Sequence, residues 1–213
     1  MNVLALYDIH GNLEALDAVL ADPRAAGADA VVVGGDVYPG PFVDAVLERL
    51  RALDVPTHWV RGNGEREDGG ALAELPLTLE LDGVLYCHAT PRSDEEILTR
   101  ISSPERWSDA LAGVEHALVV AGHTHQQDDR MVGDVRFVNA GSIGLPYEGD
   151  GDARWLWVAG GEPDLRRTAY DAAGAGRRIL DSGWPDERSY NAALIDPLEP
   201  MEITRLFEER ATA

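Results

Sequence analysis

Asn2-Val-Leu-Ala-Leu-Tyr7 leads directly into Asp8-Ile9-His10, so an apolar run of strand length ends at two potential metal ligands. Such a short, mostly apolar run is typical of a buried β-strand. Ala30-Val-Val-Val33 repeats the arrangement, with Asp36 following it through Gly34-Gly35. Because ligand sites in α/β proteins form just beyond the carboxyl ends of strands, these two junctions predict an α/β domain with a site at that edge.

Strand and helix patterns alternate through the first half of the chain. Residues 13–26 and 41–53 have apolar side chains at helical spacing, and residues 56–60 have the pattern of a third strand. The resulting order of strand, helix, strand, helix and strand predicts a parallel or mixed sheet.

The second half predicts a further set of strands with helices of its own. Residues 77–81 and 84–87 flank Asp82-Gly83, a strong hairpin signal. We expect helices over residues 94–101, 104–111, 172–181 and 203–210, and strands over residues 117–121, 135–139, 155–159 and 165–170. Two runs of strands favour two sheets packed face to face with helices on both outer sides. We expect a single domain over residues 1–213, with residues 147–213 completing or decorating it.

The charge balance restricts the classes of partner. Asp and Glu number 38 against 18 Lys and Arg, which gives a formal net charge of −20. Such a charge repels duplex nucleic acid and anionic lipid, but bound cations can still attract a small anionic substrate. No run approaches the roughly 18 apolar residues that cross a bilayer, and the apolar N-terminal run is too short for a signal peptide. Cys87 is the single cysteine, so we expect a cytoplasmic protein without disulfides.

Further polar side chains follow the other predicted strands. Asn63 comes after the third strand, His88 ends the strand at residues 84–87, and His123 and His125 follow the strand at residues 117–121. Imidazole, carboxylate and amide ligands without thiolates suit Mn, Fe, Ni or Zn. Seven ligands are too many for one tetrahedral ion, but they suit two ions that share a carboxylate.

Each of these residues also has an ordinary structural interpretation when taken alone. Asp8 or Asp36 could cap a helix, and a lone His88 is more often a core histidine than a ligand. Their joint placement after successive strands favours the metal site. His58 and His116 have no such position, and we expect structural roles for them.

Together the motifs resemble the calcineurin-like metallophosphoesterases. The similarity rests on Asp8-Ile9-His10, Gly35-Asp36, Gly62-Asn63, His88 and Gly122-His123-Thr124-His125, and it covers roughly residues 1–145. In addition, Asn139-Ala-Gly-Ser142 is similar to a small prokaryotic phosphoesterase subgroup. The resemblance implies a four-layer α/β/β/α sandwich of two mixed sheets.

The resemblance also implies a role for each ligand. Metal 1 would be held by Asp8, His10 and His125, and metal 2 by Asn63, His88 and His123, with Asp36 bridging both. A hydroxide bridging the two ions would attack a phosphomonoester or phosphodiester, which makes Asp8, Asp36, Asn63 and His123 the catalytic set.

One position departs from the family pattern. Many members have a histidine after the Gly-Asn pair that protonates the leaving group, whereas this chain has Gly64, followed by Glu65 and Arg66. Loss of a general acid typically lowers the rate by about 10²–10⁴-fold. Either Glu65, Arg66 or a metal-bound water replaces it, or the substrate has a good leaving group, as aryl esters and phosphoanhydrides do, or the protein is a non-catalytic metal-binding scaffold.

Substrate contacts are less strongly indicated than ligands. Arg61 and Arg66 suit phosphate oxygens because guanidinium groups bind them in pairs, and Thr90 and Ser142 follow ligand-bearing strands; all four could equally be turn or surface residues. Tyr147 and Trp184 are candidates for a pocket wall. The helical tail after Trp184 could cover an edge or mediate homo-oligomer formation, and the expected partner is a small phosphorylated molecule.

Overall fold

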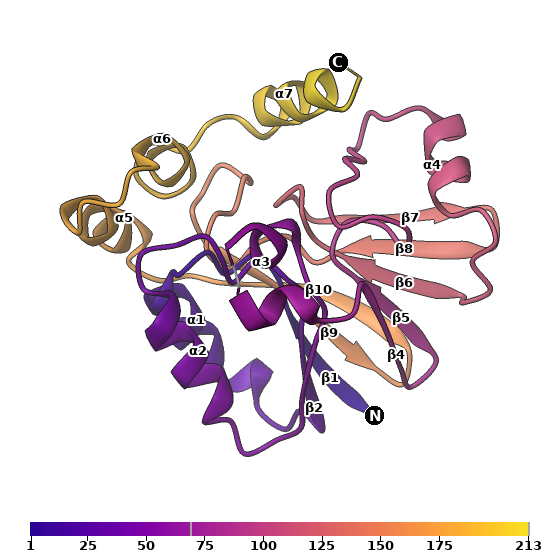
Figure 1. Cartoon of the computed structure of the whole chain (residues 1–213), viewed down its shortest axis with the longest axis horizontal. Coiled ribbons are helices and arrows are strands. Elements are labelled where there is room, and N and C mark those ends of the chain that lie inside the picture. Colours follow the sequence, from indigo (N-terminus) through magenta and orange to yellow (C-terminus); the bar gives the residue numbers. More distant parts are fainter. Residues whose placement is uncertain (69, 213) are drawn as a thin grey trace.

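Two five-stranded sheets form the centre of the molecule (Figure 1). The computed structural model describes residues 1–68 and 70–212. The first sheet has the order β10 (Glu162–Thr168), β9 (Ala153–Ala159), β1 (Asn2–Leu6), β2 (Ala30–Val33) and β3 (Thr57–Trp59). The second has the order β4 (Thr78–Leu81), β5 (Val84–Cys87), β6 (Leu118–Ala121), β8 (Val135–Asn139) and β7 (Asp128–Val132). Both sheets are mixed: β1, β2 and β3 are parallel, as are β5, β6 and β8, and antiparallel strands complete the edges.

The α-helices of the described chain are α1 (Leu13–Ala21), α2 (Val43–Arg51), α3 (Asn63–Asp68), α4 (Pro104–Ala110), α5 (Ala172–Asp181), α6 (Glu187–Tyr190) and α7 (Pro200–Thr212). Short 3-10 turns occupy Pro23–Ala25 and Gly70–Glu74, and a π-helical turn occupies Asn191–Ile195. No helix in the described part of the chain is both long and apolar enough to cross a membrane.

Alternation along β1 separates the layers. Leu4 and Leu6 pack into a core shared with α1 and α2, whereas Val3 and Ala5 face the second sheet and pack with residues of β5, β6 and β8. A third core lies between the second sheet and α4, around Trp107. Successive side chains of a strand point to opposite faces, so these cores confirm the predicted four-layer α/β/β/α sandwich.

Local sequence explains several of the boundaries. Asn12 accepts a hydrogen bond from the Ala15 backbone at 3.1 Å and caps α1. The predicted helix over residues 13–26 ends at Ala21, because Pro23 cannot continue it. The hairpin at Asp82-Gly83 is confirmed, with φ values of +53° and +78° that suit a tight two-residue turn.

The prediction of a helix over residues 94–101 is wrong, because that segment has turns and irregular backbone instead. Its polar side chains have partners elsewhere: Asp94 binds Arg61 and Arg66, and Thr99 donates to Glu208 on α7. Strand β7 was not predicted, since Asp128-Asp-Arg-Met-Val132 lacks an apolar run. It is an edge strand, where polar side chains reach solvent.

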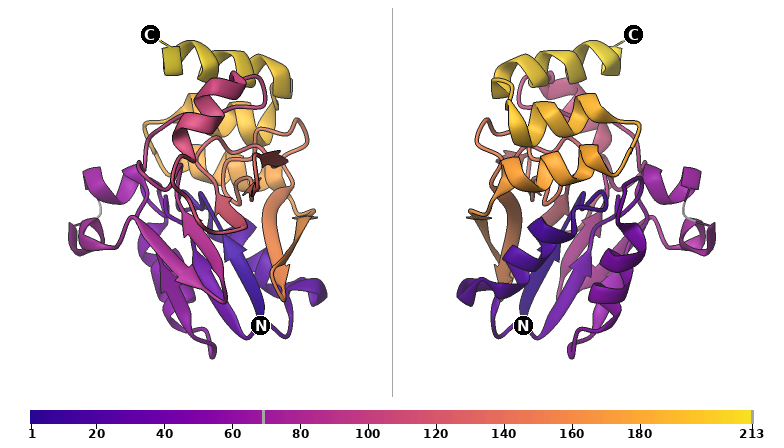
Figure 2. Two further views of the ribbon diagram at one scale, coloured as in Figure 1. Left: turned by 90° about the vertical axis from the view of Figure 1, so that its right-hand side faces the viewer. Right: turned by 90° about the vertical axis from the view of Figure 1, so that its left-hand side faces the viewer.

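The C-terminal part contributes both to a sheet and to a cover. Strand β9 pairs with β1, and β10 with β9, so these two strands complete the first sheet. Figure 2 shows α5, α6 and α7 at the end of the molecule opposite the N-terminus, above the carboxyl ends of the parallel strands. The elements after Trp184 therefore lie over the edge at which the predicted ligands are placed.

Candidate metal centre

The predicted ligands come from the carboxyl ends of parallel strands in both sheets. Asp8 and His10 follow β1, Asp36 follows β2, and Asn63 begins α3 after β3. His88 follows β5 directly, and His123 and His125 follow β6. Because both sheets direct these ends to the same side, residues from five strand ends meet at one place.

The backbone is strained at most of these positions. Six described non-glycine residues have positive φ, and five of them are predicted ligands with φ of 46–70°: Asp8, His10, Asp36, His123 and His125. Each such conformation costs on the order of 1 kcal/mol or more and persists where the surroundings enforce it, most often at functional sites. The sixth, Asp82, is in the hairpin turn.

Three histidines are oriented by backbone carbonyl groups. Nδ1 of His10 lies 3.2 Å from the Pro39 oxygen, Nδ1 of His88 lies 2.9 Å from the Gly34 oxygen, and Nδ1 of His125 lies 2.9 Å from the Leu145 oxygen. A neutral imidazole that donates from Nδ1 has its lone pair on Nε2. This arrangement, in which one ring nitrogen is fixed by a hydrogen bond, is the usual one for metal-binding histidines.

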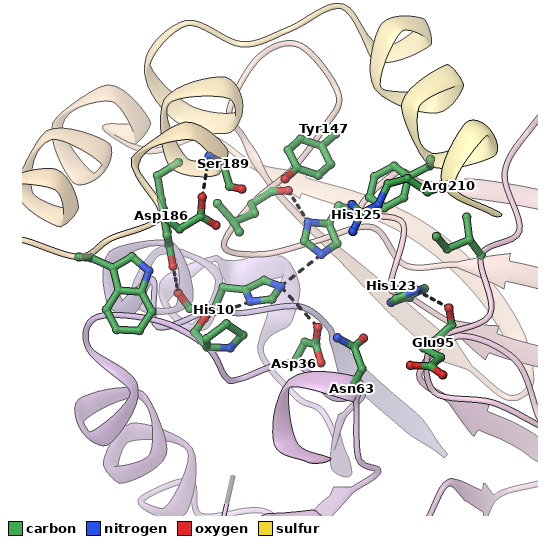
Figure 3. Close-up of a pocket in the computed structure, with 16 residues that line it drawn as sticks. His10, Asp36, Asn63, Glu95, His123, His125, Tyr147, Asp186, Ser189 and Arg210 are labelled. Atoms are coloured by element: carbon green, nitrogen blue, oxygen red, sulfur yellow. Dashed lines mark hydrogen bonds and ion pairs between the residues drawn. The ribbon is translucent and has the colours of Figure 1, made fainter. Parts of the chain in front are cut away.

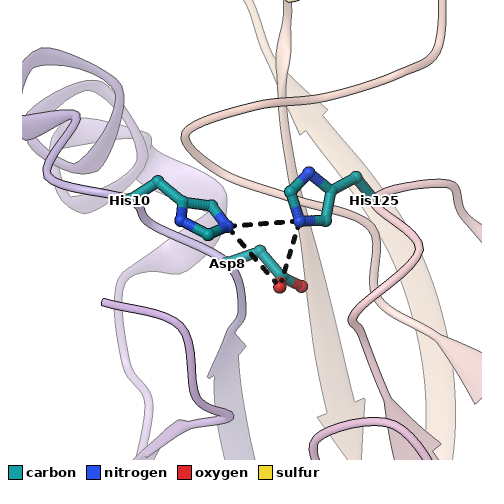
Figure 4. Close-up of side chains that lie close together, drawn as sticks. All are labelled: Asp8, His10 and His125. Carbon is teal, nitrogen blue, oxygen red and sulfur yellow. Dashed lines mark hydrogen bonds and ion pairs between the residues drawn. The ribbon is translucent and has the colours of Figure 1, made fainter. Parts of the chain in front are cut away.

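Asp8, His10 and His125 form one potential ligand group (Figure 4). Nε2 of His125 lies 3.3 Å from Asp8 Oδ1 and 3.2 Å from Nε2 of His10. When both rings donate from Nδ1 to these carbonyl groups, the two Nε2 atoms and Asp8 Oδ1 are three acceptors that face one another. A cation resolves this repulsion, so the donor set fits a metal ion.

Asp8, Asp36 and His88 form a second group. Nε2 of His88 lies 3.5 Å from Asp36 Oδ1, and Nε2 of His10 lies 3.7 Å from Asp36 Oδ2, so the two oxygens of Asp36 face histidines of different groups. Asp8 Oδ1, His88 Nε2 and Asn63 Oδ1 are buried polar atoms without a hydrogen-bond partner among the described residues. Such atoms are rare in proteins; five occur among the described residues, these three on predicted ligands and the other two on Tyr86 and Trp107.

His123 has a different position from the other histidines. Its ring meets that of His88 edge-on with centroids 5.1 Å apart, and its Nε2 lies 3.2 Å from the Glu95 carbonyl oxygen. It lies outside both tight groups, although its backbone N–H donates to Asp8 Oδ2 at 2.9 Å. The structure thus brings five of the seven predicted ligands together in the two groups, and Asn63 and His123 line the same cleft beside them.

Glycines allow the ligand loops to approach closely. A Cβ on Gly62 would lie 2.1 Å from Asp36 Oδ1, and one on Gly122 would lie 2.4 Å from Asp8 Oδ2. Both distances are far inside van der Waals contact. The two glycines therefore permit the placement of the carboxylates.

Burial and neighbouring charge set the protonation states. Burial lowers the pKa of His10 to about 3 and that of His123 to about 3, so both imidazoles are neutral, which is the form that binds metals. Burial raises the pKa of Asp36 to about 7. Burial also opposes ionisation of Asp8, but the nearby His125 and His88 hold its pKa below the usual range. The charges of Asp36 and Asp8 outweigh the burial of His88 and raise its pKa.

Glu65 fixes the loops around Asp36, a role that the sequence did not indicate. Its carboxylate accepts backbone hydrogen bonds from Asp36, Val37, Tyr38 and Gly62 at 2.7–3.2 Å, and its side chain is buried. With both oxygens engaged as acceptors, Glu65 is not placed to donate a proton.

The histidine position of the family cannot hold a side chain in this backbone. A Cβ on Gly64 would lie 2.1 Å from the Tyr38 carbonyl oxygen and 3.1 Å from Asp36 Oδ1. Instead, the Gly64 backbone N–H donates to Asp36 Oδ1 at 2.8 Å. This part of the loop orients the carboxylate.

The four predicted substrate contacts lie outside the cleft at the metal centre. Arg61 and Arg66 form ion pairs with Asp94, and Arg66 also pairs with Glu95. Thr90 is buried and donates to Glu96, and Ser142 is buried and donates to the Asp8 carbonyl oxygen. A phosphate contact through any of them stays a prediction that would require rearrangement.

A cleft of about 630 Å³ opens beside the ligands (Figure 3). Its inner end is lined by His10, Asp36, Asn63, His123 and His125. The outer wall comes from the C-terminal part of the chain and includes Trp184, Asp186, Ser189, Tyr190, Phe207 and Arg210. Tyr147 and Trp184 thus line the cleft as proposed, whereas no sequence pattern indicated the residues of α6 and α7.

An aromatic series connects the metal centre to α7. The ring of Tyr147 stacks on His125 with centroids 5.1 Å apart and an interplanar angle of 14°, and it lies 6.1 Å from the ring of Phe207. On the other side, the Tyr190 hydroxyl donates to the His10 carbonyl oxygen at 2.5 Å. Helices α6 and α7 are therefore connected to the metal centre at two places, the backbone of His10 and, through Tyr147, the ring of His125.

Comparison with known proteins places the chain in a family. The calcineurin-like phosphoesterase superfamily domain matches residues 1–156. The phosphodiesterase YfcE of Escherichia coli (strain K12) is 29% identical over 161 residues, which cover 70% of this chain and 83% of that protein. The chain belongs to the calcineurin-like phosphoesterase superfamily.

Solved structures show the same fold. A metallophosphoesterase from Sphaerobacter thermophilus has a TM-score of 0.73 at 22% identity, covering 91% of this chain and 100% of the other. The hypothetical protein PH1004 from Pyrococcus horikoshii OT3 has a TM-score of 0.75 at 19% identity, covering 92% and 99%. Both comparisons extend beyond residue 156, so they include much of the C-terminal part.

Proposed function

We propose that the protein is a metal-dependent hydrolase of phosphomonoesters or phosphodiesters that uses two divalent transition-metal ions, Mn, Fe, Ni or Zn. The observation that supports this most directly is the convergence of Asp8 Oδ1, His10 Nε2 and His125 Nε2, which lie 3.2–4.0 Å from one another. The second group, around Asp36 and His88, shares Asp8 with the first. A bound pair of such ions would supply hydroxide at neutral pH and offset the charge of the phosphoryl group.

The chain's own residues would hold and orient the reactants. Asp36 presents one oxygen toward each histidine group, which suits a bridging ligand. Asp8 is buried and receives the His123 backbone N–H on Oδ2, so its Oδ1 stays directed into the centre. Asn63 contributes a buried amide oxygen without another described partner. The substrate would enter through the cleft bordered by Tyr147 and Trp184.

A non-catalytic scaffold has less support than an enzyme. A surface used for protein contacts needs neither strained backbone at five ligand positions nor three unpartnered buried acceptor and imidazole atoms.

The buried single Cys87 is consistent with a reducing, cytoplasmic location.

The test is an activity panel across metals. We expect protein loaded with Mn, Ni, Zn, Fe or Mg to hydrolyse p-nitrophenyl phosphate, bis(p-nitrophenyl) phosphate or a cyclic nucleotide with at least one metal. Asp36→Asn should lower the rate at least about a hundredfold with every metal. Asp44→Asn, an exposed carboxylate on α2, is the matched control. Metal analysis showing two bound ions but no turnover of any substrate would favour the scaffold.

A further inference from the structure

The loop that carries a proton donor in many relatives is closed in this chain. Gly64 has no room for a side chain, and Glu65 accepts four backbone hydrogen bonds. Arg66 is engaged with Asp94 and Glu95. A guanidinium also stays charged at all relevant pH values and is a poor acid. The structure therefore favours a leaving group that departs without a proton from this loop.

A second cleft of about 510 Å³ continues from the metal cleft. Four residues line both clefts: Tyr147, Ser189, Phe207 and Arg210. The outer cleft has an apolar wall formed by Ala192, Leu198, Ile203, Leu206 and Phe207. A ligand whose phosphoryl group lies at the metal centre can therefore extend outward along Tyr147 and Phe207 onto apolar surface.

The charged groups at this outer cleft are mainly cationic. Arg188 and Arg210 line it together with a single acidic residue, Glu209. In a chain with a formal net charge of −20, such a surplus of positive charge is locally unusual. Neither arginine has an ion pair with another residue within 1–68 or 70–212, whereas Arg61, Arg106 and Arg178 all do. An unpaired guanidinium suits a phosphate, because its planar N–H groups match phosphate oxygens.

Helix α7 holds Arg210 in a defined place. The Thr204 hydroxyl is buried and donates to Gln126 Oε1 at 2.7 Å, and Gln126 Nε2 donates to the Pro200 carbonyl oxygen at 2.8 Å. On the other face, Glu208 accepts hydrogen bonds from Thr99, Ser102 and Arg106. Since Gln126 directly follows the ligand His125, the helix is fixed relative to the metal centre. In Figure 3, Arg210 extends from α7 among the cleft residues.

We propose that the outer cleft is a leaving-group site for an anionic phosphate attached to an apolar or aromatic group, so that the substrates extend beyond esters to a phosphoanhydride such as a nucleoside diphosphate, which is cleaved in preference to an alkyl ester. This inference rests on the proposed metal-dependent phosphoryl hydrolysis and extends it from esters to anhydrides. Arg210 binds the phosphate that leaves, with Arg188 adding to the positive field, and the apolar wall receives the planar group.

The chemistry agrees with the closed loop around Gly64. Hydrolysis of ADP forms a bond between a water oxygen and the terminal phosphorus and breaks the bond to the bridging oxygen. The electron pair of the broken bond departs with AMP, and the proton of the water passes to solvent. The second pKa of a phosphate monoester is about 6, so the departing oxygen is stable without a proton at neutral pH. An alkoxide leaving group lacks this property and would need the missing acid.

Steady-state kinetics with three substrates tests the inference. We expect the metal-loaded protein to cleave ADP at least about a hundredfold faster than glycerol 3-phosphate, since only the latter needs a general acid. Arg210→Gln should raise KM for ADP about tenfold and leave bis(p-nitrophenyl) phosphate within about twofold. Arg205→Gln is the matched control, because Arg205 is also exposed on α7 but lines neither cleft.

Calorimetry with AMP supplies a readout that does not depend on turnover. AMP should bind more tightly than adenosine, and Arg210→Gln but not Arg205→Gln should weaken it about tenfold. If esters are cleaved but the two variants behave alike with ADP and AMP, the leaving-group site is wrong and the proposed function stands. If no substrate is cleaved while AMP binding depends on Arg210, the hydrolytic function fails and the anion site stands.

Discussion

Asp36 has to satisfy two opposing conditions. It lies beside Asp8 and Glu65 and is buried, which raises its pKa to about 7, yet a bridging ligand must be ionised. A hydrogen bond from the Gly64 N–H and the nearby His88 favour the charged form but do not outweigh burial. A pair of cations would remove this conflict. We therefore expect the metal-free protein to carry a destabilising carboxylate.

Asp36→Asn should stabilise the metal-free protein in a pH-dependent way. A carboxyl with a folded pKa above its unfolded value contributes stability below the unfolded pKa, near 3.8, and loses it as pH rises toward about 7. Asn has no such titration. In the presence of a chelator, the free energy of unfolding of the variant should exceed that of wild type. The difference should grow between pH 4 and 7 and level off above, at a value on the order of a few kcal/mol. Denaturant unfolding at pH 5 and pH 8 measures this difference. A difference that does not change with pH would contradict the raised pKa of Asp36.

A second prediction at the residue scale concerns substitutions of Gly64. Replacing a helical glycine by alanine usually stabilises a protein by about 1 kcal/mol. Here a Cβ would lie 2.1 Å from the Tyr38 carbonyl oxygen, a backbone atom that cannot turn away. We expect Gly64→Ala and Gly64→His both to lower the free energy of unfolding, by about 1–3 kcal/mol or more. Because the first carbon causes the clash, the two losses should be similar, and the imidazole introduced by Gly64→His should not restore cleavage of alkyl esters. A stabilising Gly64→Ala would show that the loop can open.

At the scale of elements, Glu65 joins the start of α3 to the loop after β2. Its four backbone hydrogen bonds hold Asp36 and Gly62 at the spacing that the metal centre needs. Glu65→Gln replaces an acceptor oxygen by an NH₂ group that faces backbone N–H donors. Leaving buried donors unsatisfied should lower the free energy of unfolding by about 2–4 kcal/mol and weaken metal binding. Glu48→Gln, on the exposed side of α2, should change neither property. If calorimetry gives the same metal affinity for Glu65→Gln and Glu48→Gln, Glu65 does not position the metal ligands.

The sequence predicts some of the strands and helices correctly and others not. The ligand-bearing strands were found because β1, β2, β5 and β6 are short apolar runs that end at polar residues. Strand β7 was missed because an edge strand does not need an apolar face, and the helix over residues 94–101 was wrong because Asp94 and Thr99 bind distant partners. Arg210 could not be found, since the position of α7 depends on Gln126 and on residues 99–106, contacts that no local pattern encodes.

At the scale of the whole molecule, the chemistry is confined to one end. The carboxyl ends of the parallel strands and the cover of α6 and α7 lie opposite the N-terminus (Figure 2), and the strained ligand positions follow those strand ends. The chain as a whole is strongly acidic, and the two proposed ions together with the arginines of the outer cleft would give this end a local charge opposite to that of the rest. A small anion would be directed toward this end, and the approach should weaken as salt is added.

Metal removal should affect the stability of the whole fold. The two ligand groups draw on both sheets, and bound ions would tie β1 and β2 of the first to β5 and β6 of the second. A ligand present at a hundred times its Kd stabilises a protein by about 2.7 kcal/mol, so two sites contribute roughly 5 kcal/mol. For a domain of this size, Tm should then fall by about 10–20 °C in chelator. Thermal unfolding with and without Mn measures it, with sodium chloride at matched ionic strength separating specific binding from screening of the −20 charge. Asp36→Asn should reduce the shift to at most that of one ion, and an unchanged shift in this variant would mean that the stabilising metal binds elsewhere.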